Sequence, residues 1–216
     1  MDQEEIWAAL AVERRGLADL LAALPAADWE RPSLCAGWRV RDVAAHLTFA
    51  TAHTGRALAA FARARGDFDR AIHDSAVRLA RRLSPERIVA EIRRSAGSHR
   101  RAPSTKPLDP LFDVLVHGQD IAVPLGLDRA VPVAAARACV AHVWGRGFPF
   151  HPQRRFAGLR FAATDAGWAG GAGERVEGPV GSLLLVLSGR AAGLAGLTGP
   201  GVPELAERLT PTVRAG

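Results

Sequence analysis

Apolar residues recur about every 3.6 positions along the first two thirds of the chain, which predicts a series of amphipathic helices. The first run covers residues 3–24 and ends at Pro25, since proline cannot continue a helix. A turn-rich stretch leads into a second helix, expected from about Val40 to Arg65. Further helices are expected over residues 68–83, from residue 84, from residue 109 and over residues 133–146.

Two of these helices carry local start signals. Ser84 can accept a hydrogen bond from an unpaired N–H of the first turn, and Pro85 suits the first helical position. Asp109 and Pro110 repeat the same arrangement. We therefore place helix starts at both sites.

The sequence pattern changes after the segment GRGFPFHPQ, near residue 147. RFAGLRFAATD alternates like a strand, GAGERVEGP is typical of a turn, VGSLLLVLSGR of a short helix ending at Gly189, and ELAERL of a last helix. The sequence thus predicts a mostly α protein with two domains. Residues 1–147 form a helical bundle and residues 148–216 a small α+β domain.

Composition is that of a folded protein with a full core. Of the residues 48% are hydrophobic and 23% charged, and no apolar run approaches the roughly 18 residues of a membrane span. The first residues are acidic, unlike a signal peptide. Cys35 and Cys139 are too few for a disulfide framework. These features predict a cytoplasmic protein without a membrane partner.

The excess of basic residues, 28 Lys and Arg against 22 Asp and Glu, is concentrated between Arg63 and Arg101. Only one aromatic residue, Phe68, accompanies these arginines, so the segment has few side chains that could stack on nucleic-acid bases. We interpret the segment as solvated helix faces and expect no nucleic-acid partner. An anion-attracting rim around an active site is the alternative.

Asp113 and His117 stand four residues apart in LFDVLVHGQDIA and share one face of a helix. A carboxylate on a face that is otherwise apolar is costly to bury unless it is paired or bound to a metal. His46 lies on another predicted helix, among apolar neighbours. Two ligands from one helix and one from another would leave an open position, as in catalytic zinc sites. A plain Asp–His hydrogen bond and a core histidine are the simpler interpretations.

Two stretches, PSLCAGWRVRDVAAHL and DPLFDVLVHGQDIAVPLG, together resemble the mycothiol-dependent maleylpyruvate isomerase family. This family is part of the DinB-like group of metal-binding helical bundles. The residues that match the family pattern are Ser33, Cys35, Gly37, Trp38, Asp42, His46, Asp113, His117, Gly118 and Asp120.

The resemblance implies an up-and-down DinB-like bundle followed by a small C-terminal domain. It implies a divalent metal, usually zinc, held by His46, Asp113 and His117, and mycothiol as thiol cosubstrate. The sequence departs from the family at three positions. Family members typically have glutamate where this chain has Asp113, often threonine at Arg39 and frequently tryptophan at Gln119.

The function expected on this basis is a metal- and thiol-dependent isomerase or S-transferase. Its substrate would be a small electrophile that carries a carboxylate, and Arg190 is the candidate carboxylate anchor, with a helix-end charge as the simpler role. A metallohydrolase or a non-catalytic binding protein are the alternatives. Cys35 is interpreted as a packing residue rather than a nucleophile. The chain is expected to be a monomer or a homodimer.

Overall fold

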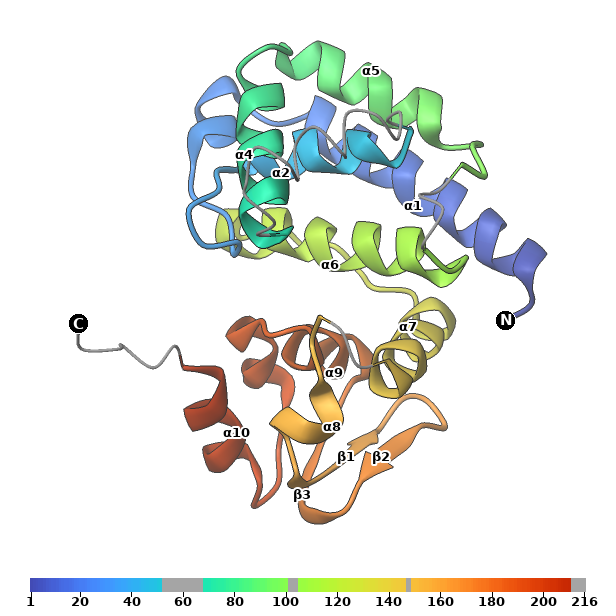
Figure 1. Cartoon of the computed structure of the whole chain (residues 1–216), viewed down its shortest axis with the longest axis vertical. Helices are drawn as coiled ribbons and strands as arrows, with labels where there is room; N and C mark the ends of the chain where they lie inside the picture. The colour runs from blue at the N-terminus through green and yellow to red at the C-terminus, as the bar shows by residue number, and fades with distance from the viewer. Residues whose placement is uncertain (52–67, 101–104, 147–148, 211–216) are drawn as a thin grey trace. The chain divides into compact units, whose positions relative to one another are not determined.

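A computed structural model describes residues 1–51, 68–100, 105–146 and 149–210 of the chain (Figure 1). It divides into two compact units, Asp2–Arg129 and Ala130–Gly216. The first is helical and the second combines helices with a three-stranded sheet. The prediction of a mostly α protein with a helical bundle and a small C-terminal sheet is confirmed.

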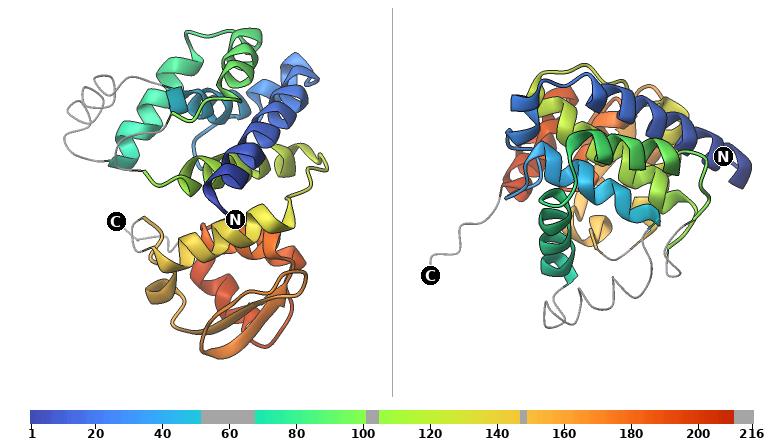
Figure 2. Two further views of the ribbon diagram at one scale, coloured as in Figure 1. Left: turned by 90° about the vertical axis from the view of Figure 1, so that its right-hand side faces the viewer. Right: turned by 90° about the horizontal axis from the view of Figure 1, so that it is seen from above.

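Helices pack in pairs in the first unit. α1 packs against α5 and α6, and α2 packs against α4 and α6. α4 runs steeply across the direction of α2 and α5 (Figure 2, right). The elements are α1 (Gln3–Ala22), η1 (Ala26–Glu30), α2 (Val40–Leu47), η2 (Thr48–Thr51), α4 (Phe68–Ala80), α5 (Pro85–Ser95) and α6 (Leu108–Leu125). The largest fully buried side chains of this core are those of Leu10, Leu17, Leu21, Ile88, Ile92, Leu111, Leu115 and Ile121.

The predicted start signals are partly confirmed. Ser84 precedes α5, and its Oγ accepts a hydrogen bond from the Arg87 N–H at 3.3 Å, as expected for an N-cap. The start predicted with Asp109 as cap and Pro110 as first helical residue is wrong by two residues, because α6 begins at Leu108 with Pro107 at the cap position. The Asp109 carboxylate nevertheless accepts a hydrogen bond from the Lys106 N–H at 2.7 Å, just before the helix.

α2 is the helix on which the fold of the site depends. It is observed from Val40 to Leu47 and continues as a 3₁₀ turn to Thr51, while the rest of the predicted helix lies outside the described residues. Arg39 cannot cap it with an accepting side chain. Instead, the Asp42 carboxylate accepts from the Arg39 N–H at 2.9 Å and from two guanidinium nitrogens at 3.0 and 3.1 Å. A capping box has two side-chain-to-backbone hydrogen bonds, one from each end. Here Asp42 makes the one that reaches back to the N–H of the cap residue.

The second unit is built around α9, which packs against α7, η3 and β1. The boundary between the compact units therefore precedes α7 rather than following it near residue 147, because α7 packs on α9. The elements are α7 (Val133–Gly145), α8 (Pro152–Arg155), β1 (Gly158–Ala163), β2 (Ala169–Gly171), β3 (Gly173–Gly178), α9 (Val180–Leu187), η3 (Ala191–Gly196) and α10 (Val202–Leu209).

The sheet has the order β2-β1-β3, with β2 antiparallel and β3 parallel to β1 (Figure 2, left). The interpretation of GAGERVEGP as a turn is therefore wrong for most of its length, since β3 lies within it. The chain passes from β2 to β3 around the start of β1 through Ala172 alone. Gly171 and Gly173 have φ values of 82° and 121°, and a Cβ on Gly173 would lie 1.9 Å from the Gly158 carbonyl oxygen. Only glycine fits there.

Arginines in the basic segment form ion pairs along helix surfaces. Arg87 and Arg94 both contact Glu91 on α5, at 3.0 and 2.7 Å, and Arg93 contacts Asp19 of α1 at 2.6 Å. These pairs fit the interpretation of solvated helix faces. None of the helices in the described residues is long and apolar enough to span a bilayer.

We expect Gly173→Ala to destabilise the second unit, because the new methyl group collides with the Gly158 carbonyl in a strained backbone conformation. Backbone strain of this kind costs about 1–3 kcal/mol before the collision is counted. Urea unfolding followed by tryptophan fluorescence measures the loss. Gly167→Ala is the matched control, since a Cβ added there would have no atom within 4 Å. Equal midpoints for the two variants would contradict this account of the turn.

Candidate metal centre

Three potential ligands converge between α2 and α6 of the first unit. Oδ1 of Asp113 lies 3.5 Å from Nε2 of His46 and 3.4 Å from Nε2 of His117. One ligand atom from each residue lies within 4.8 Å of the others. The histidine side chains are 14% and 13% exposed and Asp113 39%, so the cluster is open mainly at the carboxylate. The structure thus brings His46 of α2 close to Asp113 and His117 of α6.

These distances suit ligands of a shared metal ion better than they suit hydrogen bonds. An N–H···O bond has its usual length near 2.9–3.0 Å. Two ligands that each bind one tetrahedral zinc ion at about 2.0–2.1 Å lie about 3.3 Å apart. The shorter side chain of aspartate therefore reaches both imidazoles, and the set of two nitrogens and one oxygen suits zinc or another divalent transition metal.

Charge is strongly coupled within the cluster. Burial alone raises the pKa of the Asp113 carboxyl, but His46 and His117 outweigh burial and hold that pKa far below its usual range. Burial lowers the pKa of His117, but Asp113, Asp120 and Cys35 together raise it well above its usual value. Without a bound cation, the cluster therefore pairs a carboxylate with a protonated imidazole. A divalent cation can take the place of that proton.

Behind the cluster, Asp120 fixes the orientation of His117. Its Oδ2 lies 2.7 Å from Nδ1 of His117, which places the proton on Nδ1 and leaves Nε2 free to face Asp113. Metal-binding histidines usually have such an acceptor on the other ring nitrogen. The Cys35 thiol donates to the same oxygen at 3.0 Å, and its sulfur lies 3.7 Å from Nδ1 of His117. Asp120 is completely buried.

The turn before α2 forms one wall of the site. Gly37 has a φ of 76°, which only glycine adopts without strain, and the turn places Trp38 over the cluster. The Trp38 ring centroid lies 5.3 Å from that of His46 and 6.2 Å from that of His117. Nδ1 of His46 is buried without a hydrogen-bond partner among the described residues. Nε2, which faces Asp113, is therefore the atom through which His46 can bind a ligand.

Sequence reasoning missed part of this arrangement. Asp120 stands three residues after His117 on the same helix, a spacing that could have indicated the contact. Cys35, interpreted as a packing residue, contacts Asp120 instead, and no sequence pattern predicts this pairing. Arg190 belongs to the second unit, where its Nη1 donates to the Ser188 carbonyl at 2.7 Å. Its role in substrate binding stays a prediction.

Residues 10–112 match the family model described as the mycothiol maleylpyruvate isomerase N-terminal domain. The likeness to that domain family thus extends over just under half of the chain. The matched region includes His46 and ends immediately before Asp113, so the second pair of potential ligands lies just outside it. A comparison with curated protein sequences finds no match.

Two solved structures resemble the whole chain. They are crystal structures of the mycothiol-dependent maleylpyruvate isomerase and of a histidine-to-alanine mutant of it. The TM-scores are 0.64 for the former and 0.65 for the mutant, each at 14% identity, and each alignment covers 93% of both chains. At this identity the likeness establishes the fold, including the second unit.

In the metal-free protein, we expect Asp113→Asn to lower the pKa of His117, because the negative charge of Asp113 raises it. The imidazole would then lose its proton at a lower pH than in the wild type. Histidine Cε1–H resonances followed by NMR during a pH titration measure the change. Asp74→Asn, which alters the pairing of Asp74 with His73, should leave the pKa of His117 unchanged. An unshifted His117 in the Asp113 variant would show that the two side chains are not coupled.

Proposed function

We propose that the protein is a metal-dependent enzyme that uses a low-molecular-weight thiol, mycothiol, either to isomerise a small electrophile or to form a thioether with it. The observation that carries the proposal is the spacing of the two Nε2 atoms and the Asp113 oxygen, which fits ligands of one ion. The family match over residues 10–112 supports mycothiol as the thiol. The open side of the cluster at Asp113 supports a catalytic rather than a structural site.

His46, Asp113 and His117 would hold a divalent cation, preferably zinc, which lowers the pKa of a coordinated thiol far below its free value of about 8.5. The remaining contributions come from the protein. Asp120 holds His117 in the tautomer that can bind the cation. Trp38 covers the imidazoles and limits the access of water on that side. Both effects keep the site preorganised.

The proposed reaction begins with addition of the thiolate sulfur to one carbon of an activated double bond. The π electrons move onto the conjugated carbonyl oxygen, and the former double bond becomes a single bond that can rotate. When those electrons return, the carbon–sulfur bond breaks and releases the thiolate with the isomerised product. No proton is consumed overall. If a proton instead traps the adduct on carbon, the product is a thioether, which corresponds to S-transfer.

Arg190 is the proposed anchor for a substrate carboxylate. A planar guanidinium can donate two parallel hydrogen bonds to a carboxylate, which a lysine ammonium cannot reproduce. Arg190 is half-buried at the end of α9, where its Nη1 also donates to the Ser188 carbonyl.

The function is tested by measuring metal content and thiol consumption in the same samples. We expect about one divalent ion per chain, and loss of mycothiol in the presence of an activated, carboxylate-bearing alkene. His46→Ala and His117→Ala should remove both, because each deletes a ligand. Asp113→Asn keeps an oxygen but loses the charge, so it should weaken metal binding without abolishing it.

His99→Ala provides the control, since His99 is not one of the clustered residues and stacks on Trp7, with ring centroids 4.7 Å apart. It should retain metal and activity. Stoichiometric metal in both His46→Ala and His117→Ala would refute the ligand assignment. Metal binding without thiol consumption would instead favour a hydrolase.

The role of Arg190 is tested by Arg190→Lys, which keeps the charge but loses the bidentate geometry. We expect unchanged metal content and thiol binding, with kcat/KM for carboxylate substrates reduced about tenfold or more, a loss of roughly 1.4 kcal/mol in transition-state stabilisation. Steady-state kinetics with a carboxylate substrate and its uncharged amide separate the two roles. Kinetics equal to wild type would show that Arg190 does not anchor the substrate carboxylate.

A further inference from the structure

Arg14 is a buried cation on the inner face of α1. Its position between Leu10 and Leu17 places it on the apolar face of that helix, and it is only 4% exposed. Its Nη1 donates to the carbonyl oxygens of Ser95 at 2.8 Å and Ser98 at 3.2 Å, at the C-terminal end of α5. This contact has a structural role, because it joins α1 to the end of α5 and to the residues that follow it.

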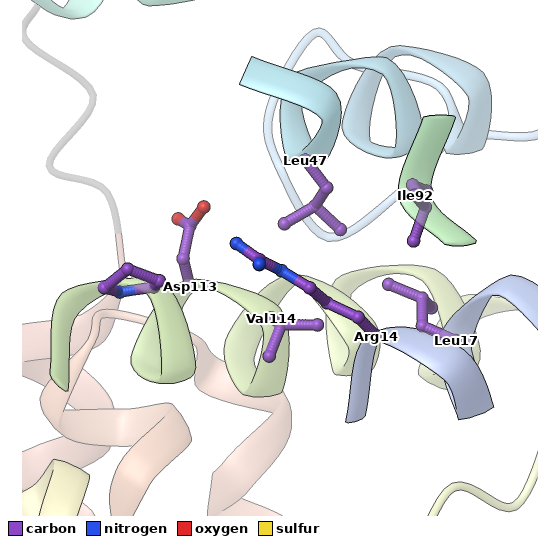
Figure 3. A pocket seen from close by; sticks show the side chains of 7 residues that line it. Arg14, Leu17, Leu47, Ile92, Asp113 and Val114 are labelled. Carbon is purple, nitrogen blue, oxygen red and sulfur yellow. The ribbon is translucent and has the colours of Figure 1, made fainter. Parts of the chain in front are cut away.

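The other side of the guanidinium is not used within the described residues. Nε and Nη2 of Arg14 have neither a hydrogen-bond partner nor an ion-pair partner in this part of the chain. Figure 3 shows the guanidinium pointing toward Asp113 into a pocket lined also by Leu17, Leu47, Ile92, Pro110 and Val114. Burial lowers the pKa of Arg14, and the negative charge of Asp113 offsets this only in part.

Arg129 shows how a buried arginine of the same unit is normally satisfied. Its Nη2 lies 2.6 Å from the Glu13 carboxylate, and both side chains are 9% exposed. Arg14 has no such carboxylate in contact among the described residues. Nε and Nη2 of Arg14 are not among the fully buried polar atoms that lack a partner, which agrees with their position at the pocket, where an acceptor can bind them.

We propose that the Nε–Nη2 edge of Arg14 binds a carboxylate of the electrophilic ligand beside the metal ligands, in addition to any carboxylate that Arg190 anchors. The inference deepens the proposed function and rests on it, because Asp113 is both a metal ligand and a wall of this pocket. Two parallel N–H donors match the two oxygens of a carboxylate. Arg14 would thus determine specificity for anionic substrates from within the bundle, independently of Arg190.

The dimensions and lining of the pocket fit the head group of a ligand. The pocket offers about 20 Å³ for the centre of a water-sized sphere, which is room for about one water-sized group. The ligand would therefore place only the end of its carboxylate in the pocket and extend outward past Asp113. The apolar side chains of Leu17, Leu47 and Val114 exclude water and strengthen the charge–charge attraction. A cation bound to Asp113 would offset the negative charge of this side chain. An anionic ligand would then supply the negative charge that faces Arg14.

The test follows the Arg14 Nε–H resonance by NMR in the full-length wild-type protein, with acetate as the probe and acetamide as its uncharged analogue. The resonance is assigned by its disappearance in Arg14→Lys. We expect acetate to shift it saturably and acetamide to leave it in place. A resonance that does not respond to acetate, or responds equally to acetamide, overturns the proposal.

Variants separate recognition from stability. Arg14→Gln should weaken acetate binding about tenfold or more, the loss of roughly 1.4 kcal/mol expected when a charged hydrogen-bonded pair is broken. Arg15→Gln, an exposed neighbour on α1, should bind acetate like the wild type. A lower melting temperature of Arg14→Gln with unchanged acetate affinity would leave only the α5 contact and refute the proposal.

Metal content measured in the same samples keeps the two hypotheses apart. A wild-type chain that binds no metal but shows the acetate response of Arg14 would refute the metal-dependent function and retain the anion site. A wild-type chain that binds metal but shows no acetate response of Arg14 would refute the anion site and retain the metal-dependent function.

Discussion

The Asp113 carboxylate between two imidazoles is the contact on which the arrangement of the first unit depends. It joins α2 to α6, and neither helix alone could keep these groups buried at acceptable cost. The local features around it serve this contact. Asp42 and Arg39 fix the start of α2, Gly37 allows the preceding turn, and Asp120 sets the ring orientation of His117. The site is therefore supported from several sides.

The surroundings of the cluster divide into a rigid side and an open side. On the rigid side, Asp120 accepts hydrogen bonds from both His117 and Cys35, so the turn and α6 share one buried carboxylate. On the open side, Asp113 faces the pocket that contains Arg14. The hydrogen bonds to Asp120 suit a site that holds an ion in place. The open side at Asp113 suits the exchange of ligands. Burying charged groups is unfavourable for stability. A functional role explains the presence of this polar cluster better than a stabilising role does.

Much of the bundle could be predicted from the sequence, because helical periodicity and capping are local. The pairing of Asp113 with His117 follows from helical spacing, whereas their proximity to His46 was expected from the family resemblance. The Cys35–Asp120 contact and the unsatisfied edge of Arg14 depend on tertiary packing, although an arginine on the apolar face of α1 was a signal. β3 was missed because glycine-rich segments are typical of turns. The boundary between the two units lies before α7 rather than after it, because α7 packs on α9. The periodicity of a helix does not reveal which neighbour it packs against.

The backbone link between the turn and α6 has a consequence for how the protein folds. The Leu34 N–H donates to the Asp120 carbonyl at 3.0 Å, so the loop that this contact closes spans most of the first unit. Closing such a loop costs chain entropy that only long-range packing repays, and contacts of this kind form slowly. During synthesis, His46 leaves the ribosome well before α6 is complete. Assembly of the ligand set is thus a late step, and a bound ion would mark chains whose bundle is already closed.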